Sequence, residues 1–213
     1  MISLLFVYLS IFSVLLPLIN ALLQWKSLSK NLKPILYLTV ISFVVDAISF
    51  FCAGWHINTW GFINSFYVIQ FALLFIILSE QRKIPLLRLL FYGCLLFAVI
   101  NFLFIQTPKV FNTYTAYAGG ILIITVALNY IYFIINETYI EKIQTLPLFW
   151  LSFGVLVYYG GTLFLFLFNN YLIEHFQTGN QVAWVLHNLL NVVKNIFLFI
   201  ALWVHHKRRK SLL

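Results

Sequence analysis

The segment VAWVLHNLLNVVKNIFLFIALWVH, residues 182–205, is a long apolar run with one charged residue, Lys194, and the basic cluster HKRRK follows it directly. A run of about 20 apolar residues is the length that an α-helix needs to cross the hydrocarbon core of a bilayer. Basic residues just after such a run are typical of the cytoplasmic end of a span. The segment therefore predicts a transmembrane helix that ends in a basic tail.

The rest of the chain repeats this pattern. Of its 213 residues, 63% are hydrophobic and 8% are charged, whereas a soluble domain has about 25% charged residues. We expect an all-α, polytopic membrane protein, a seven-transmembrane-helix bundle formed by one domain (residues 1–206) and followed by a basic cytoplasmic tail (residues 207–213). The predicted spans are Ile2–Leu23, Pro34–Trp55, Trp60–Leu78, Leu86–Ile105, Thr113–Ile135, Leu148–Leu172 and Val182–His205.

Proline and glycine residues add local detail to this prediction. Pro17 lies inside the first span, where a missing N–H kinks a helix. The pairs Gly119–Gly120 and Gly160–Gly161 lie within later spans. Small residues in a membrane helix let a neighbouring helix approach closely, so we interpret these pairs as packing sites.

The distribution of Lys and Arg predicts the orientation. Basic residues follow spans one, three, five and seven, whereas the opposite set of loops contains only Lys109. Because cytoplasmic loops carry the excess of Lys and Arg, this alternation places the N-terminus outside and the C-terminus in the cytoplasm. The basic residues of the first set are Lys26, Lys30, Lys33, Arg82, Lys83, Arg88, Lys142, Lys207, Arg208, Arg209 and Lys210.

The same clusters explain the net charge of +8. In a soluble protein this charge would suggest nucleic acid, but short basic clusters between apolar runs indicate topology instead, so we exclude a nucleic-acid partner. We expect a multi-pass protein of the cell membrane, of the bacterial inner-membrane type, with the lipid bilayer as its first partner.

Two charges remain inside the predicted spans, Asp46 and Lys194. A charge at the bilayer centre costs about 2.5–3.5 kcal/mol on insertion scales, so each needs a partner, water or a function. Counting about 1.5 Å per residue from the span ends places the two backbones within about 6 Å in depth. A lysine stem can cover that gap. We therefore expect a buried Asp46–Lys194 ion pair in a polar cavity.

Uncharged polar residues share helical faces with these two charges. Span seven carries His187, Asn188, Asn191 and Asn195 beside Lys194, and span two carries Ser42 and Ser49 beside Asp46. Because lipid cannot form hydrogen bonds, such faces point toward the interior of a bundle. The predicted ligand or ion-pair cavity, between spans two, three and seven, comprises Ser42, Asp46, Ser49, Asn64, Tyr67, Gln70, His187, Asn188, Asn191, Lys194 and Asn195.

Other kinds of site find less support in the sequence. No residue pattern marks a catalytic nucleophile, and no tight spacing of His, Asp, Glu or Cys marks a metal site. The cofactor is unknown. A lysine in the seventh span invites comparison with retinal proteins, but Leu190 and Gln70 stand where microbial rhodopsins carry carboxylates. A purely structural role, in which the polar residues only hold helices together, stays open.

The string WVLHNLLNVVKN, residues 184–195, together with seven spans and short loops, resembles uncharacterised bacterial seven-helix membrane proteins and the seven-helix sensor modules of some histidine kinases. The resemblance implies a sensor of a small or lipidic ligand that acts through a protein partner. The leading hypothesis is thus a receptor-like or sensory protein. The alternatives are a small transporter of a solute or proton that uses Asp46 and Lys194, a membrane-embedded lipid enzyme, or a subunit of a complex; a non-catalytic role is favoured.

Overall fold

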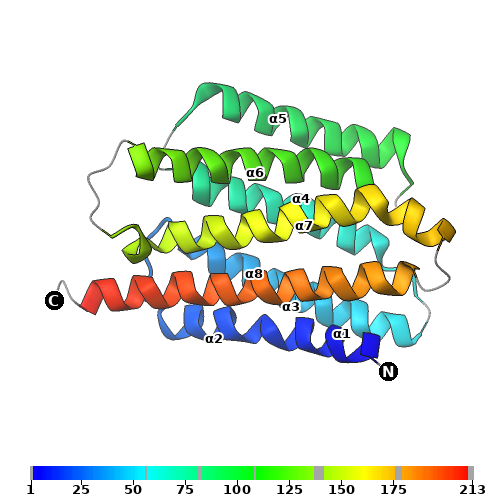
Figure 1. Ribbon diagram of the computed structural model, residues 1–213, viewed down its shortest axis with the longest axis horizontal. Coiled ribbons are helices and arrows are strands. Elements are labelled where there is room, and N and C mark those ends of the chain that lie inside the picture. The colour runs from blue at the N-terminus through cyan, green and yellow to red at the C-terminus, as the bar shows by residue number, and fades with distance from the viewer. Residues whose placement is uncertain are drawn as a thin grey trace.

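The computed structural model of the chain describes residues 2–55, 57–80, 83–107, 109–136, 142–175 and 179–210. Helices make up nearly all of this part (Figure 1). They are α1 (Ile2–Ser13), α2 (Leu15–Leu23), α3 (Lys33–Gly54), α4 (Trp60–Ser79), α5 (Pro85–Ile100), the π-helix η1 (Asn101–Ile105), α6 (Thr113–Asn136), the 3₁₀-helix η2 (Ile143–Thr145), α7 (Pro147–His175) and α8 (Gly179–Lys210).

Within these residues, seven helices are long and apolar enough to cross a membrane, which agrees with the predicted number of spans. The first span consists of α1 and α2 together, and the fourth consists of α5 and η1. The largest difference from the predicted ends is at α8, which continues to Lys210 instead of ending at His205. The prediction of an all-α bundle with seven helices of membrane-spanning length is therefore confirmed.

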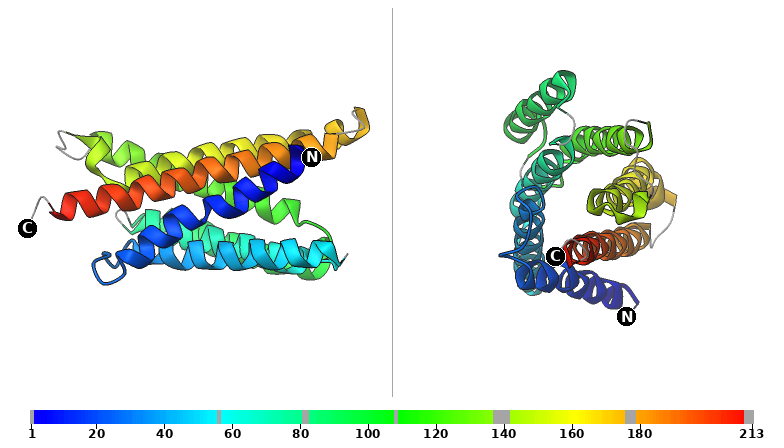
Figure 2. Two further views of the ribbon diagram at one scale, coloured as in Figure 1. Left: turned by 90° about the horizontal axis from the view of Figure 1, so that it is seen from below. Right: turned by 90° about the vertical axis from the view of Figure 1, so that its left-hand side faces the viewer.

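The predicted kink at Pro17 is confirmed as a break at Val14, between α1 and α2. Proline has no N–H for the carbonyl four residues earlier, which belongs to Ser13, and its ring crowds that carbonyl. The Ser13 hydroxyl donates a hydrogen bond to the Ser10 carbonyl over 2.7 Å. The first span therefore slants across the bundle, with α2 packed on α3 and α1 packed on α8 (Figure 2).

The helices form a closed ring around an interior. Neighbours around the ring are α2, α3, α4, α6, α7 and α8, and α8 packs in turn on both α1 and α2. Helix α5 lies outside this ring against α6 and α4, as the end-on view in Figure 2 shows. The interior of the ring is the place where polar side chains can avoid lipid.

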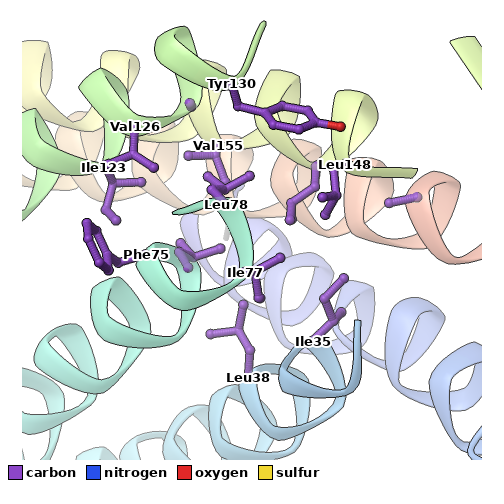
Figure 3. Packing of buried hydrophobic residues seen from close by; sticks show 14 of the residues in the cluster. Ile35, Leu38, Phe75, Ile77, Leu78, Ile123, Val126, Tyr130, Leu148 and Val155 are labelled. Atoms are coloured by element: carbon purple, nitrogen blue, oxygen red, sulfur yellow. The ribbon is translucent and has the colours of Figure 1, made fainter. Parts of the chain in front are cut away.

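The apolar core fills the half of the ring nearer the C-terminus. Figure 3 shows how some of its side chains pack together. The core joins the start of α3, the end of α4, the end of α6, the start of α7 and the end of α8. Fully buried members include Ile35, Ile77, Ile123, Leu151 and Leu202. The other half of the interior contains the polar residues described below.

The two chain ends lie at opposite ends of the bundle (Figure 1). Among the described basic residues outside the spans, Lys109 lies at the N-terminal end, and the others lie at the end that carries the C-terminus. The arrangement is the one that the orientation prediction requires, and the side of the membrane stays a prediction.

Candidate functional site

A polar chamber of about 160 Å³ lies inside the ring, in the half opposite the apolar core. Helices α1, α3, α4, α7 and α8 contribute its walls, together with the loop before α6. One water molecule occupies about 30 Å³ of liquid, so the space accommodates a small polar group or several waters. Its lining residues are Ser10, Ser42, Val45, Asp46, Ser49, Ile63, Phe66, Tyr67, Phe111, Tyr158, Trp184, His187, Asn188, Asn191 and Lys194.

The structure brings together most of the residues that the sequence assigned to a cavity. Spacings of three and four residues place these side chains on one face of each helix. The predicted residues that line the chamber are Ser42, Asp46 and Ser49 from α3, Tyr67 from α4, and His187, Asn188, Asn191 and Lys194 from α8.

Lys194 is the most deeply buried charge of the chamber, with 4% of its surface exposed. Its ammonium lies over the Tyr158 ring, 4.4 Å from the ring centroid. Among the described residues, neither a carboxylate nor a carbonyl oxygen accepts a hydrogen bond from this ammonium. A cation on an aromatic face is stabilised, but its N–H groups are left without acceptors.

Asp46 faces the same chamber but does not touch Lys194. The direct ion pair that the depth estimate predicted is not formed, since no nitrogen–oxygen distance of 4.0 Å or less joins these two described side chains. Both side chains nevertheless line the same small chamber. The depth estimate compared positions along the membrane normal and did not include the distance between the two helices. In the structure α3 and α8 lie on different sides of the chamber, and the ammonium lies on the Tyr158 ring of α7.

Three predicted cavity residues have other positions. Asn195 is buried, and its amide donates a hydrogen bond to the Ser13 hydroxyl over 2.8 Å, which ties α8 to α1. Asn64 holds the loop before α6, donating to the Val110 carbonyl and accepting from the Asn112 N–H. These two side chains stabilise packing and do not line the chamber.

Gln70 is the third. It is completely buried near the hydroxyls of Tyr158 and Tyr159, next to the chamber but outside its lining. Within the described part of the chain, neither atom of its amide has a hydrogen-bond partner.

Ser10 and Tyr158 also line the chamber, although neither belongs to the predicted cavity set. The Ser10 hydroxyl accepts a hydrogen bond from the Asn191 amide over 2.8 Å, and the Tyr158 hydroxyl lies 3.4 Å from that of Tyr67. The spacing of Ser10 and Ser13, three residues apart in an apolar helix, was a signal that could have identified the first of these. Tyr158 is one of the polar residues of span six, which were expected to face the interior, but the cavity was predicted between spans two, three and seven only.

Aromatic rings cover the chamber at the end of the bundle opposite the apolar core. The Trp60 ring contacts those of Phe111 and Trp184, at centroid distances of 5.8 and 6.0 Å. The Phe111 ring contacts Tyr67 at 5.1 Å, and Trp184 contacts His187 at 5.5 Å. Such ring contacts add about 0.5–1.5 kcal/mol each to burial, so they help to hold the rings of this cover together.

The chamber offers binding chemistry, with one cation, one carboxylate and several amide and hydroxyl groups. Among the residues that the structure describes, no three His, Cys, Asp or Glu side chains come together as a metal site requires. In the comparisons with known proteins, no family model, curated protein or solved structure matches this chain. Its function is therefore inferred from the chamber.

Proposed function

We propose that this chain is a receptor-like or sensory membrane protein that binds a small or lipidic molecule in the polar chamber. The molecule's polar group lies between Asp46 and Lys194. The occupied state is passed on to a protein partner. The N-terminus is outside, the C-terminus is in the cytoplasm, and the membrane is of the bacterial inner-membrane type.

One observation carries the proposal. The Lys194 ammonium is buried, opens onto a chamber and has no hydrogen-bond acceptor among the described side chains. A charge in this position costs several kcal/mol unless something neutralises or solvates it. Asp46 borders the same space without contact, so a bound polar group could interact with both charges at once.

A second observation favours binding over passage. The apolar core closes the ring on the C-terminal side of the chamber, with side chains such as Leu74, Leu151 and Leu202 almost completely buried. A transported solute would have to cross this packed layer. The chamber is therefore closed toward the C-terminal side, which suits a receptor better than a transporter.

The test is to identify what co-purifies with the protein and to measure binding in two chamber variants, Asp46→Asn and Lys194→Met. We expect mass spectrometry to find a small molecule in the unmodified protein that is lost from both variants while their thermal unfolding stays cooperative. Lys207→Met, in the basic tail, is the matched control and should retain the molecule.

Two results would overturn the proposal. One is unchanged ligand content in both chamber variants. The other is solute flux through the purified protein in liposomes that depends on Asp46, because a receptor moves nothing across the membrane.

A further inference from the structure

A groove of about 720 Å³ runs between α1 and α3 and reaches the first turns of α8. Its walls are apolar and aromatic, formed mainly by Leu4, Val7, Tyr8 and Ile11 of α1 and by Phe50 and Phe51 of α3. The Tyr8 and Phe50 rings meet at a centroid distance of 5.5 Å. Its lining is that of a hydrocarbon-binding surface.

This groove adjoins the polar chamber. Ser10, Asp46, Ser49, Trp184 and Asn188 line both spaces, whereas Lys194 lines the chamber alone. Asp46 therefore lies where the two spaces adjoin, and Lys194 lies on the chamber side. A molecule that occupied both spaces would have to be apolar at one end and polar at the other.

The slant of the first span accounts for the opening. The helix of the first span is interrupted at Val14. On one side of this interruption α2 packs closely on α3, and on the other side α1 contacts α3 only sparsely and packs on α8 (Figure 2). The two helices separate toward the N-terminal end, and the groove fills the space between them. In a membrane-spanning ring, such a gap between two neighbouring helices faces lipid.

The route along the bundle axis is different. Trp60, Phe111 and Trp184 form the aromatic cover at one end of the chamber, and the apolar core closes the other end. On the side between α1 and α3, by contrast, a groove of about 720 Å³ adjoins the chamber.

We propose that the chamber ligand is a single-chain acidic amphiphile that enters from the bilayer between α1 and α3, an inference that rests on the proposed function. Its hydrocarbon chain lies in the groove, its terminal acid group pairs with Lys194, and a hydrogen-bond donor beside the acid faces Asp46. An acyl chain linked through an amide to a small acid has this order of groups.

The order of the charges is the reason for this choice. A chain that enters through the groove passes Asp46 first and presents its far end to Lys194. The group that complements a buried ammonium is an anion, and the group that complements a carboxylate is an N–H or O–H donor. A phospholipid with a terminal ammonium would present like charge to Lys194.

The experiment uses three probes on the full chain in phosphatidylcholine nanodiscs. N-dodecanoylglycine has the chain, the amide donor and the acid; N-acetylglycine lacks the chain; the methyl ester of N-dodecanoylglycine lacks the charge. We expect N-dodecanoylglycine to bind at least tenfold more tightly than either of the others. The comparison needs no variant, so it does not depend on how a substitution affects folding.

Two variants then test whether the hydrocarbon chain of the ligand lies in the groove. Ile11→Trp fills the groove and should weaken N-dodecanoylglycine binding at least tenfold, whereas Leu9→Trp, on the exposed face of the same helix, should leave it unchanged. Equal binding of the methyl ester, or an unaffected Ile11→Trp protein with normal unfolding, would overturn the inference.

Two further outcomes separate this inference from the proposed function. If N-acetylglycine binds as tightly as N-dodecanoylglycine and binding requires Lys194, the chamber is a receptor site and the groove is not part of it. If none of the three probes binds, the inferred ligand class is wrong. A molecule that co-purifies in a Lys194-dependent manner would then still support the proposed receptor function of the chamber.

Discussion

At the scale of single residues, the contact between Lys194 and Tyr158 positions the buried ammonium in the chamber. The ammonium lies 4.4 Å from the ring centroid and has no acceptor among the described residues. A cation–π contact that is removed from water is worth about 2 kcal/mol or more. The ring therefore holds the lysine in place while its N–H groups stay available to a ligand.

Substitution of Tyr158 tests this role. We expect Tyr158→Leu to lower the free energy of unfolding by about 2 kcal/mol because the ring is lost, and Tyr158→Phe to lower it by less than about 1 kcal/mol because only a long 3.4 Å hydroxyl contact is lost. The measurement is equilibrium unfolding in detergent. In a Lys194→Met background the extra cost of Tyr158→Leu over Tyr158→Phe should shrink; an unchanged difference would assign it to packing alone.

Individual polar residues were only partly predictable. Asp46, Asn188, Asn191 and Lys194 were identified because charge and periodicity in an apolar helix are local signals. Asn195 could not be separated from them, since its hydrogen bond to Ser13 depends on a helix 182 residues away in sequence. The ammonium position on Tyr158 depends likewise on how α7 is rotated.

At the scale of helices, glycines on α7 set its distance from α8. A side chain at Gly154 would collide with the Cβ of Phe197, and one at Gly161 would come within 2.6 Å of the Leu190 side chain. Gly119 and Gly120 of α6 likewise face neighbouring side chains, so the packing interpretation of the glycine pairs agrees with the structure at three of four positions. Gly160 is the exception, with open space around it.

This difference gives a matched pair of substitutions. Gly154→Ala should destabilise the protein by about 1–3 kcal/mol, because Phe197 Cβ is fixed to its backbone and the two helices must separate. Gly160→Ala should be neutral or stabilise by up to about 1 kcal/mol, since alanine favours a helix. Thermal unfolding of both variants in one detergent checks this. Equal effects at the two positions would show that α7 and α8 are not packed in this way.

Local chemistry also explains which irregularities of the helices could be predicted. The break at Val14 could be predicted from Pro17, because the missing N–H and the ring of a proline act on the helical turn just before it. The π-helical turn Asn101–Ile105 has no such signal. It accompanies two hydrogen bonds from the Asn101 amide, a local one to Gln106 at 3.0 Å and one to Thr115 of α6 at 2.8 Å. The second bond exists only once this segment meets α6.

At the scale of the whole molecule, the number and limits of the spans follow from the sequence, whereas the order of the helices around the ring does not. The cavity was expected between spans two, three and seven, and spans one and six also contribute walls through Ser10 and Tyr158. Hydropathy sets the length of a span, but neighbours are chosen by the shape and rotation of packed surfaces.

The orientation can be tested with single cysteines in a background that carries Cys52→Ser and Cys94→Ala. We expect Lys109→Cys to react with a membrane-impermeant maleimide added outside intact cells, and Lys142→Cys to react only after the membrane is opened, because the predicted orientation keeps the basic loops in the cytoplasm. Labelling of both sites in intact cells, or of Lys142→Cys alone, would contradict this orientation.

Helix α8 links the chamber to the C-terminal tail without interruption. It runs from Gly179 to Lys210, 32 residues, and at about 1.5 Å per residue it is about 48 Å long, more than the thickness of a hydrocarbon core of about 30 Å. Lys194 lies near its middle and the basic residues lie at its end. A small rotation or tilt of this helix at the level of the ammonium would thus also move Arg208 and Arg209, because no helix break lies between them to absorb the movement.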